Sequence, residues 1–233
     1  MSDDWKALFA QALKLIKDVE KNAGPFEWSF GGGTALMLQD GHRESRDIDI
    51  FLKNVQLLPY FSPRTNDVAE QISRDYEEDS RYIKLALPDE KGEIDFIAAP
   101  YITANPFFQK TIDGQSVKIE TPEEIIGKKV FYRTETFLVR DVFDLVVFLH
   151  LHKDRFLENA GLFSPKKETL KKRIDLLFKK SGYERTVSGY VKPLPNGVLF
   201  AKQEAFAHAM DILDSLKPLR ITFKSGLKTK NRP

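Results

Sequence analysis

The sequence contains no cysteine among its 233 residues. Disulfide bonds, thiolate zinc sites and thiol nucleophiles are therefore excluded, and this composition fits a reducing compartment. No apolar run approaches the ~20 residues that span a bilayer. The N-terminus, Met1-Ser2-Asp3-Asp4-Trp5, is acidic and lacks the basic flank and apolar core of a secretory signal. We therefore expect a cytoplasmic protein that does not associate with membranes.

A strong net charge is also lacking, since the formal value is only +2. This small value conceals a division along the chain: residues 1–120 carry 14 basic and 21 acidic residues, whereas residues 121–233 carry 22 and 13. An acidic half beside a basic half suits an enzyme that acts on a polyanion such as RNA. Ordinary solvated helix faces explain the same division equally well. The basic run 166–173 has the same two interpretations.

Hydrophobic periodicity predicts an α/β arrangement in the first half of the chain. The expected elements, in order, are an amphipathic helix over 3–22, a strand over 27–30, a glycine turn, a helix from Thr34, a strand from Asp47, a loop over 54–64, a polar helix over 65–79, and a hairpin of strands 81–87 and 93–98 with its turn at 88–92. These elements predict a small mixed sheet flanked by helices.

The second half of the chain is predicted to be helical. Thr121-Pro122-Glu123-Glu124 is a good helix start, apolar residues recur to about residue 150 in two segments, and amphipathic helices follow over 166–180 and 200–216. We therefore divide the chain into an α/β core over 1–120 and a helical domain over 121–233 that carries a basic surface. Because no linker separates them, the two parts are expected to form one packed whole.

The glycine run in Phe30-Gly31-Gly32-Gly33-Thr34 is the first candidate binding element. Glycines at positions 32 and 33 would let backbone N–H groups approach phosphate oxygens, and the helix that begins near Thr34 would present its positive end to the same anion. A glycine run alone is more often a simple turn. Its significance therefore depends on what lies near it.

Three aspartates on predicted strands are the candidate metal ligands. Asp47 and Asp49 stand two residues apart, so both carboxylates emerge on one face of a strand while Ile48 and Ile50 point to the other. Asp95 would join them if its strand lies beside theirs, either as a third ligand or as a base for an attacking hydroxyl, although it could simply pair with an arginine. Carboxylates at this spacing favour Mg²⁺, and two ions about 3.5–4 Å apart would serve in-line displacement at phosphorus.

Charged residues on the next two predicted helices complete the set of candidates. Lys129 and Arg133 stand at i and i+4 on one helix face, where they could neutralise a triphosphate or simply face solvent. Arg140 begins the following helix, with acids Asp141 and Asp144 at i and i+3. Asp144 could also serve as a capping or supporting acid.

These residues together resemble the nucleotidyltransferase toxins of abortive-infection and type IV toxin–antitoxin systems, the AbiEii/AbiGii group. The resemblance is carried by four segments in the family's order and spacing: Gly32-Gly33-Thr34-Ala35-Leu36, Arg43-x-Ser45-x-Asp47-Ile48-Asp49, Lys129-Val130-x-x-Arg133 and Arg140-Asp141-x-x-Asp144-Leu145. It covers residues 30 to 150. The chain departs from the pattern at Lys128-Lys129, which offers two lysines for one; we favour Lys129 because it leaves Arg133 at the expected offset.

The resemblance implies a nucleotidyltransferase fold and transfer of a nucleotide from an NTP with magnesium. In some members the acceptor is the 3′ end of tRNA, so translation is blocked, and a cognate antitoxin is implied. By this resemblance Asp47 and Asp49 would hold metal, and Lys129 and Asp141 would complete the catalytic set. Asp95 joins the metal and catalytic residues from its position on the predicted strand, not from the resemblance. The nucleotide would be bound by the remaining candidates, namely Gly32, Gly33, Thr34, Ser45, Arg46, Arg133 and Asp144.

Three alternatives remain open at this point. The same fold could transfer a nucleotide to a protein or to a small molecule, or it could bind nucleotide or RNA with little catalysis. A metal-dependent nuclease fits less well, because the glycine turn and Lys129 suit a triphosphate better than a scissile diester. Residues 151–233 carry no motif that distinguishes among them.

Overall fold

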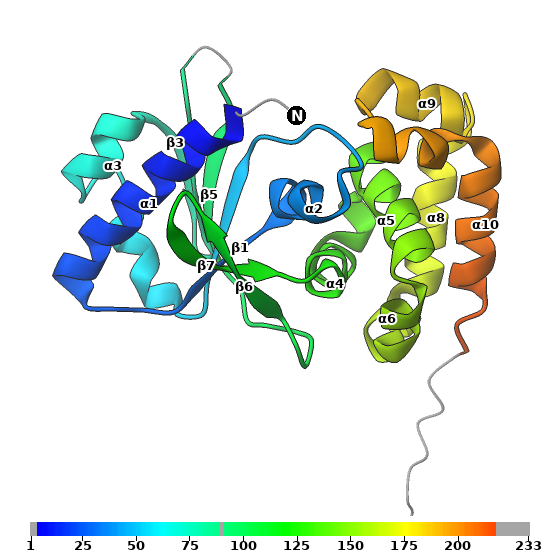
Figure 1. The fold of residues 1–233 in the computed structure, drawn as a ribbon, viewed down its shortest axis with the longest axis horizontal. Helices are drawn as coiled ribbons and strands as arrows, with labels where there is room; N and C mark the ends of the chain where they lie inside the picture. The colour runs from blue at the N-terminus through cyan, green and yellow to red at the C-terminus, as the bar shows by residue number, and fades with distance from the viewer. Residues whose placement is uncertain (1–3, 89–90, 218–233) are drawn as a thin grey trace, which may run out of the picture.

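The computed structural model describes residues 4–88 and 91–217. Its centre is a seven-stranded mixed sheet with the strand order β3-β4-β5-β2-β1-β7-β6 (Figure 1). The strands are β1 (Trp28–Gly31), β2 (Ile48–Leu52), β3 (Asp75–Asp79), β4 (Tyr82–Ala86), β5 (Glu93–Ala98), β6 (Phe107–Ile112) and β7 (Gln115–Glu120). Residues 89 and 90 of the expected hairpin turn lie outside the described range.

Helices flank the sheet and form the C-terminal part. They are α1 (Asp4–Ala23), α2 (Gly32–Asp40), α3 (Asp67–Ile72), α4 (Pro122–Arg133), α5 (Val139–Leu151), α6 (Lys153–Glu158), α7 (Ala160–Phe163), α8 (Lys167–Phe178), α9 (Tyr183–Tyr190) and α10 (Gln203–Asp214), with 3-10 turns η1 (Val55–Phe61), η2 (Thr134–Thr136), η3 (Ser164–Lys166) and η4 (Pro195–Ala201). In Figure 1, α1 and α3 lie on one side of the strands, while α2 and α4 lie between the strands and the helices from α5 onward. No helix in the described part of the chain is long and apolar enough to cross a membrane.

The central strands follow from their alternating sequence. In β2 the side chains of Ile48, Ile50 and Leu52 are buried, whereas the intervening residues are only partly buried. This strand pairs antiparallel with β1 and parallel with β5, and the second pairing sets Asp49 beside Asp95. Neighbouring residues in paired strands point to the same face. The condition stated for Asp95, that its strand lie beside that of Asp49, is therefore met.

Helix α5 lies within the hydrophobic core and joins the two halves. Ten of its residues, among them the acids Asp141 and Asp144, are buried. One contiguous cluster of buried apolar side chains runs from α1 through the sheet and α5 to α10. A helix that is apolar almost all round must be covered on every side. The α/β fold with a helical C-terminal part is thus confirmed, and the two parts share one core.

Two local predictions were wrong. The polar helix expected over 65–79 ends at Ile72 and is followed by β3, and the loop expected over 54–64 contains η1. Asn66 starts α3 by accepting hydrogen bonds from the N–H groups of Val68 and Ala69. Strand β3 is stabilised by pairing with β4 at the edge of the sheet, where its charged side chains remain exposed. The sheet is therefore larger than expected, and β6 was not anticipated.

Candidate active site

A cavity of about 370 Å³ lies on the face of the sheet that α4 covers, where candidate residues from separate segments meet. Those that line it are Gly32, Gly33, Ser45, Asp47, Asp49, Asp95, Lys129 and Arg133. Positions almost a hundred residues apart in the sequence therefore share one surface. The cavity also shows which candidates are close enough to act together.

The glycine turn packs directly against Asp49. Gly32 has a φ of +67°, which side-chain-bearing residues rarely adopt, and a Cβ there would overlap the Asp49 carboxylate. A Cβ at Gly33 would lie 2.7 Å from the Arg43 guanidinium and 2.9 Å from the Ser45 hydroxyl. Glycine is thus required at position 32 for both conformation and space. The turn opens α2, whose first N–H groups lack partners inside the helix.

Asp49 and Asp95 form a carboxylate pair, called here the strand pair. Burial, followed by the neighbouring charge of Asp49, raises the pKa of Asp95 to about 7. Burial also raises the pKa of Asp49, although Lys129 and Arg133 act in the opposite direction. Asp95 Oδ1 is buried without a hydrogen-bond partner in the described structure. Two adjacent carboxylates with an unpartnered oxygen are a fitting place for a cation.

Asp47 lies beside the strand pair but uses one oxygen for the backbone. Its Oδ1 accepts a hydrogen bond of 3.2 Å from the N–H of Glu93, the first residue of β5. Among the described residues, no three His, Asp or Glu side chains are gathered into a metal cluster. Mg²⁺ is commonly held by one or two carboxylates together with substrate phosphates and water. The residues present fit that mode of binding, and not a cage made by the protein alone.

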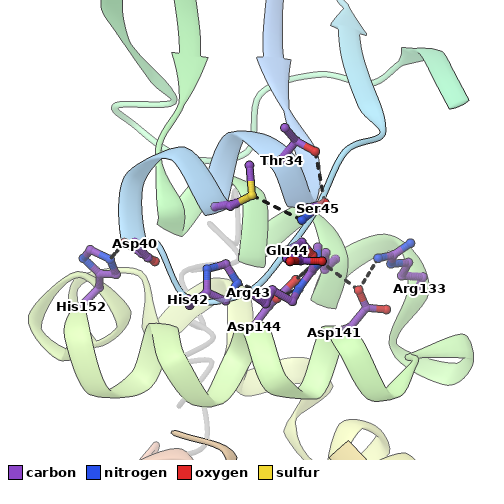
Figure 2. A network of polar contacts seen from close by, with 12 residues as sticks. Thr34, Asp40, His42, Arg43, Glu44, Ser45, Arg133, Asp141, Asp144 and His152 are labelled. Carbon is purple, nitrogen blue, oxygen red and sulfur yellow. Dashed lines mark hydrogen bonds and ion pairs between the residues drawn. The ribbon is translucent and has the colours of Figure 1, made fainter. Parts of the chain in front are cut away.

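Asp141 and Asp144 on α5, called here the helix pair, are fully buried and closely partnered (Figure 2). Lys129 Nζ lies 3.0 Å from Asp141 Oδ1 and also contacts Asp144, while Arg133 binds Asp141. Burial alone would raise the pKa of Asp144, but Arg43 and Lys129 outweigh it and hold that pKa well below its usual range. The pKa of Asp141 is likewise lowered. Both acids are therefore ionised and positioned by cations.

Asp144 connects this network to the loop before β2. Arg43 donates to it through Nε and Nη2, at 2.6 and 2.9 Å, and His42 Nε2 lies 2.8 Å from its Oδ1. Asp144 on α5 thus contacts both Arg43 in the loop (Figure 2) and Lys129 on α4. Lys129 and Arg133 project from one face of α4 and share Asp141, as their i, i+4 spacing predicts.

Lys128 occupies a different environment from Lys129, although both line the cavity. Its Nζ lies 2.6 Å from Glu120 and 3.2 Å from Glu124, and 3.9 Å from the centroid of the Phe51 ring. Burial raises the pKa of Glu120 to about 7, although Lys128 acts to lower it. Lys129, by contrast, shares its network with Arg133. The choice of Lys129 as the active lysine remains a prediction.

Four candidates are not among the described residues that line the cavity. Arg46 is exposed, and Thr34 is buried with its hydroxyl bonded to Ser45 Oγ at 3.1 Å. Asp141 and Asp144 lie beneath the cavity wall and hold its cations. Thr34 therefore contacts the cavity residue Ser45, and Asp141 and Asp144 contact the cavity residue Lys129. The structure does not bring Arg46 to the cavity.

Several cavity residues were missed by the sequence analysis. They are Arg81, Tyr82, Lys84 and Glu93 from the β4–β5 hairpin, Phe51 and Ile97 from the sheet, and Tyr132 from α4. The alternation in 81–87 contained a signal, because Lys84 pairs in register with Asp95 and so shares its face. Tyr132, next to Arg133, had no such signal. Its role depends on the tertiary packing of α4.

The basic run 166–173 is only partly a free cationic surface. Lys171 and Lys167 lie 2.6 and 3.8 Å from Asp214, and Arg173 Nε donates to the carbonyl of Phe137. Five of the 22 basic residues after position 120 lie beyond residue 217, outside the described range. The described part of this half therefore carries 17 basic against 13 acidic residues.

The sequence model of one protein family, described as nucleotidyl transferase AbiEii toxin of type IV toxin–antitoxin systems, matches residues 26–184. No curated protein matches at a significant level. Two similar solved structures are JHP933 from Helicobacter pylori, at 21% identity over 93% of this chain and 94% of that chain with a TM-score of 0.46, and ANT(2″)-Ia in complex with adenylyl-2″-tobramycin, at 16% identity over 66% and 96% with a TM-score of 0.45. The family match spans the whole cavity.

Proposed function

The chain belongs to the AbiEii family of nucleotidyltransferase toxins, and we propose that it transfers a nucleoside monophosphate from an NTP to RNA, at the 3′ end of a tRNA, with Mg²⁺. The observation that carries this proposal is the cavity where the glycine turn touches Asp49, with Asp95 and Lys129 on its walls. Such a product would inhibit translation. A cognate antitoxin in the cytoplasm and a role in phage defence belong to the same proposal.

The triphosphate binds at the N-terminus of α2. Backbone N–H groups at Gly32 and Gly33, with the Ser45 hydroxyl nearby, supply hydrogen bonds to an anion. Lys129 and Arg133 add positive charge on the α4 side of the cavity. Because both cations are already fixed by Asp141, they need little reorganisation when the substrate binds.

The strand pair and Asp47 would hold the divalent metal. When bound, Mg²⁺ supplies charge neutralisation and orients the reacting oxygens for in-line displacement of pyrophosphate. The unpartnered oxygen of Asp95 and the raised pKa values of the pair support this assignment.

The acceptor lies over the hairpin side of the cavity. In the strand order, β1 and its glycine turn lie on one side of β2, whereas β5 and β4 lie on the other. That second side offers Tyr82 and Arg81, and α4 adds Tyr132 at 45% exposure. Aromatic rings that can stack on bases, beside an arginine that forms no ion pair in the described part of the chain, suit the end of a single-stranded RNA.

The experiment is transfer of label from each of the four α-labelled NTPs to total RNA by purified protein with Mg²⁺. The expected result is labelled RNA of tRNA size, lost with chelator and in Asp49→Asn. Label on protein or on a small molecule would instead identify another acceptor. No label with any NTP, together with growth arrest that Asp49→Ala fails to relieve, would overturn the proposal.

A further inference from the structure

The loop between α2 and β2 carries several residues of the proposed site. Residues 41–47 include Arg43, which binds Asp144 (Figure 2), and Ser45, whose hydroxyl lies beside Gly33. The loop has no regular secondary structure apart from one isolated bridge residue. Something outside the loop must therefore hold its backbone in place.

That support comes from residues 191–197, called here the brace segment, which lie about 150 residues later in the chain. Arg43 forms an isolated antiparallel bridge with Pro193. The N–H of Glu44 donates to the carbonyl of Lys192 at 2.9 Å, and the N–H of Leu194 donates to the carbonyl of His42 at 3.0 Å. The brace segment thus pairs with the loop as a short strand would.

Gly197 makes this close approach possible. It is buried, and a Cβ at this position would overlap the carbonyl oxygen of His42 and lie 2.7 Å from the carbonyl carbon. The overlap would be with backbone, which cannot rotate away as the end of a side chain can. Any side chain at position 197 must therefore displace either the brace segment or the loop.

The brace segment is itself fixed to the helix that carries Asp141 and Asp144. Tyr183 and Val187 of α9 are buried in the core, and the Tyr183 hydroxyl donates to the carbonyl of Phe200 in η4 at 2.9 Å. Both α9 and η4 pack against α5. The C-terminal helices therefore pack against both the brace segment and the helix that carries Asp141 and Asp144.

We propose that the brace segment positions Arg43 and Ser45 for nucleotide binding, with Gly197 as the residue that permits the contact. The inference rests on the proposed triphosphate site and gives a role to a part of the chain that carries no motif. It acts through the loop backbone without touching substrate. Its loss should weaken NTP binding more than acceptor binding.

The sharpest test compares Leu194→Pro with Leu194→Ala. Leu194 has a φ of −80°, which proline can adopt, so the residue itself is not strained by Leu194→Pro. The substitution removes the N–H that donates to His42 and sets the ring Cδ against that carbonyl, so the brace segment must separate from the loop at this point. Leu194→Ala shortens the same side chain and keeps that N–H. We expect the KM for NTP to rise roughly tenfold in Leu194→Pro relative to Leu194→Ala, with the KM for RNA unchanged.

A second pair of variants uses glycine. Gly197→Ala should raise the KM for NTP in the same way, whereas Gly189→Ala, where no atom lies within 4 Å of the added Cβ, should leave it unchanged. Circular dichroism and thermal unfolding identify any variant that fails to fold. Equal KM values for NTP in folded Leu194→Pro and Leu194→Ala would overturn the proposal.

Amide hydrogen exchange of the wild-type protein tests the contact without any activity. The Glu44 N–H should be protected, and Leu194→Pro should speed its exchange while Leu194→Ala does not. Rapid exchange of Glu44 in the wild-type protein would overturn the brace. A wild-type protein with a protected Glu44 that transfers no nucleotide would instead contradict the proposed function and leave the brace supported.

Discussion

Two pairs of carboxylates adjoin the same cavity and differ in their electrostatics. The helix pair, Asp141 and Asp144, is fully buried, yet its pKa values are lowered because Arg43, Lys129 and Arg133 bind it directly. The strand pair has raised pKa values, and one of its oxygens has no partner in the described structure. Burial acts in the same direction on both pairs, so the cationic partners decide the outcome.

The difference separates two roles for acidic residues at one site. A carboxylate already neutralised by protein cations organises those cations, and removing it leaves them buried without a partner. A carboxylate left without such partners can bind a cation that arrives with the substrate. We therefore propose that the helix pair positions the cations and that the strand pair binds metal. Removing one member of each pair should have opposite effects on stability.

Asp144→Ala should have the largest effect on stability. It would leave Arg43 and Lys129 with an uncompensated buried charge, for which a loss of about 3–5 kcal/mol in the free energy of unfolding is typical. Urea denaturation measures this loss. Asp175→Ala, at an exposed position of α8, is the matched control and should change stability by less than about 0.5 kcal/mol. Equal stability of the two variants would contradict the positioning role.

Asp49→Asn should show the reverse pattern. Transfer activity is expected to fall by about 10²–10³-fold, because a ligand for the metal and its charge are lost. The free energy of unfolding at pH 8 should stay the same or rise, since a carboxylate with a raised pKa disfavours the folded state when ionised. Steady-state kinetics measure the loss of activity, and urea denaturation at pH 8 measures the free energy of unfolding. A large loss of stability would show that Asp49 is positioned by protein cations after all.

Glu120 is intermediate between the helix pair and the strand pair. It has a cationic partner, Lys128, as the helix pair does, and yet its pKa is raised to about 7, as in the strand pair. A folded-state pKa above the ordinary value of 4.5 means that this group favours folding below about pH 4.5 and loses that contribution as the pH rises to about 7. Between pH 4.5 and pH 8 the free energy of unfolding should therefore fall by about 2–3 kcal/mol less in Glu120→Gln than in the wild-type protein. Denaturation at pH 4.5, 6 and 8 measures it, with Glu158→Gln as the surface control. The same dependence of stability on pH in Glu120→Gln and the wild-type protein would contradict the raised pKa of Glu120.

Tyr132→Ala should have the smallest effect and should act on the acceptor alone. Loss of a stacking ring is expected to cost about 1–2 kcal/mol of interaction with the RNA. That cost corresponds to a kcat/KM for RNA lowered roughly 5- to 30-fold, with the affinity for NTP unchanged. The adjacent Phe131, which is equally exposed but is not among the described residues lining the cavity, provides the control variant Phe131→Ala. Equal effects of the two substitutions would remove Tyr132 from the acceptor side.

Local sequence patterns predicted those parts of the fold that bury one regular face. The strand–turn–helix–strand from Trp28 to Leu52, the hairpin strands and helices α4 and α5 all alternate or repeat in this way. Strands β3 and β6 escaped prediction because they are edge strands whose residues are mostly exposed. Their structure depends on pairing with β4 and β7, which the local pattern does not reveal.

The candidate site was predictable where spacing alone brings groups together, as for Lys129 with Arg133 and for Asp47 with Asp49. The partners were not predictable, because the contacts of Arg43 and Lys129 with Asp144 join three separate elements. The brace segment leaves still less trace in the sequence. It acts through backbone hydrogen bonds and one glycine, with no charged or aromatic motif.

The contrast between the two pairs is tested most directly by calorimetric titration of Mg²⁺ into the protein bound to a non-hydrolysable NTP analogue. We expect saturable binding of Mg²⁺ by the wild-type protein, tighter than by the free analogue, with that gain lost in Asp49→Asn and retained in Asp175→Ala. Binding that is unchanged in Asp49→Asn would contradict the assignment of the strand pair as the metal site.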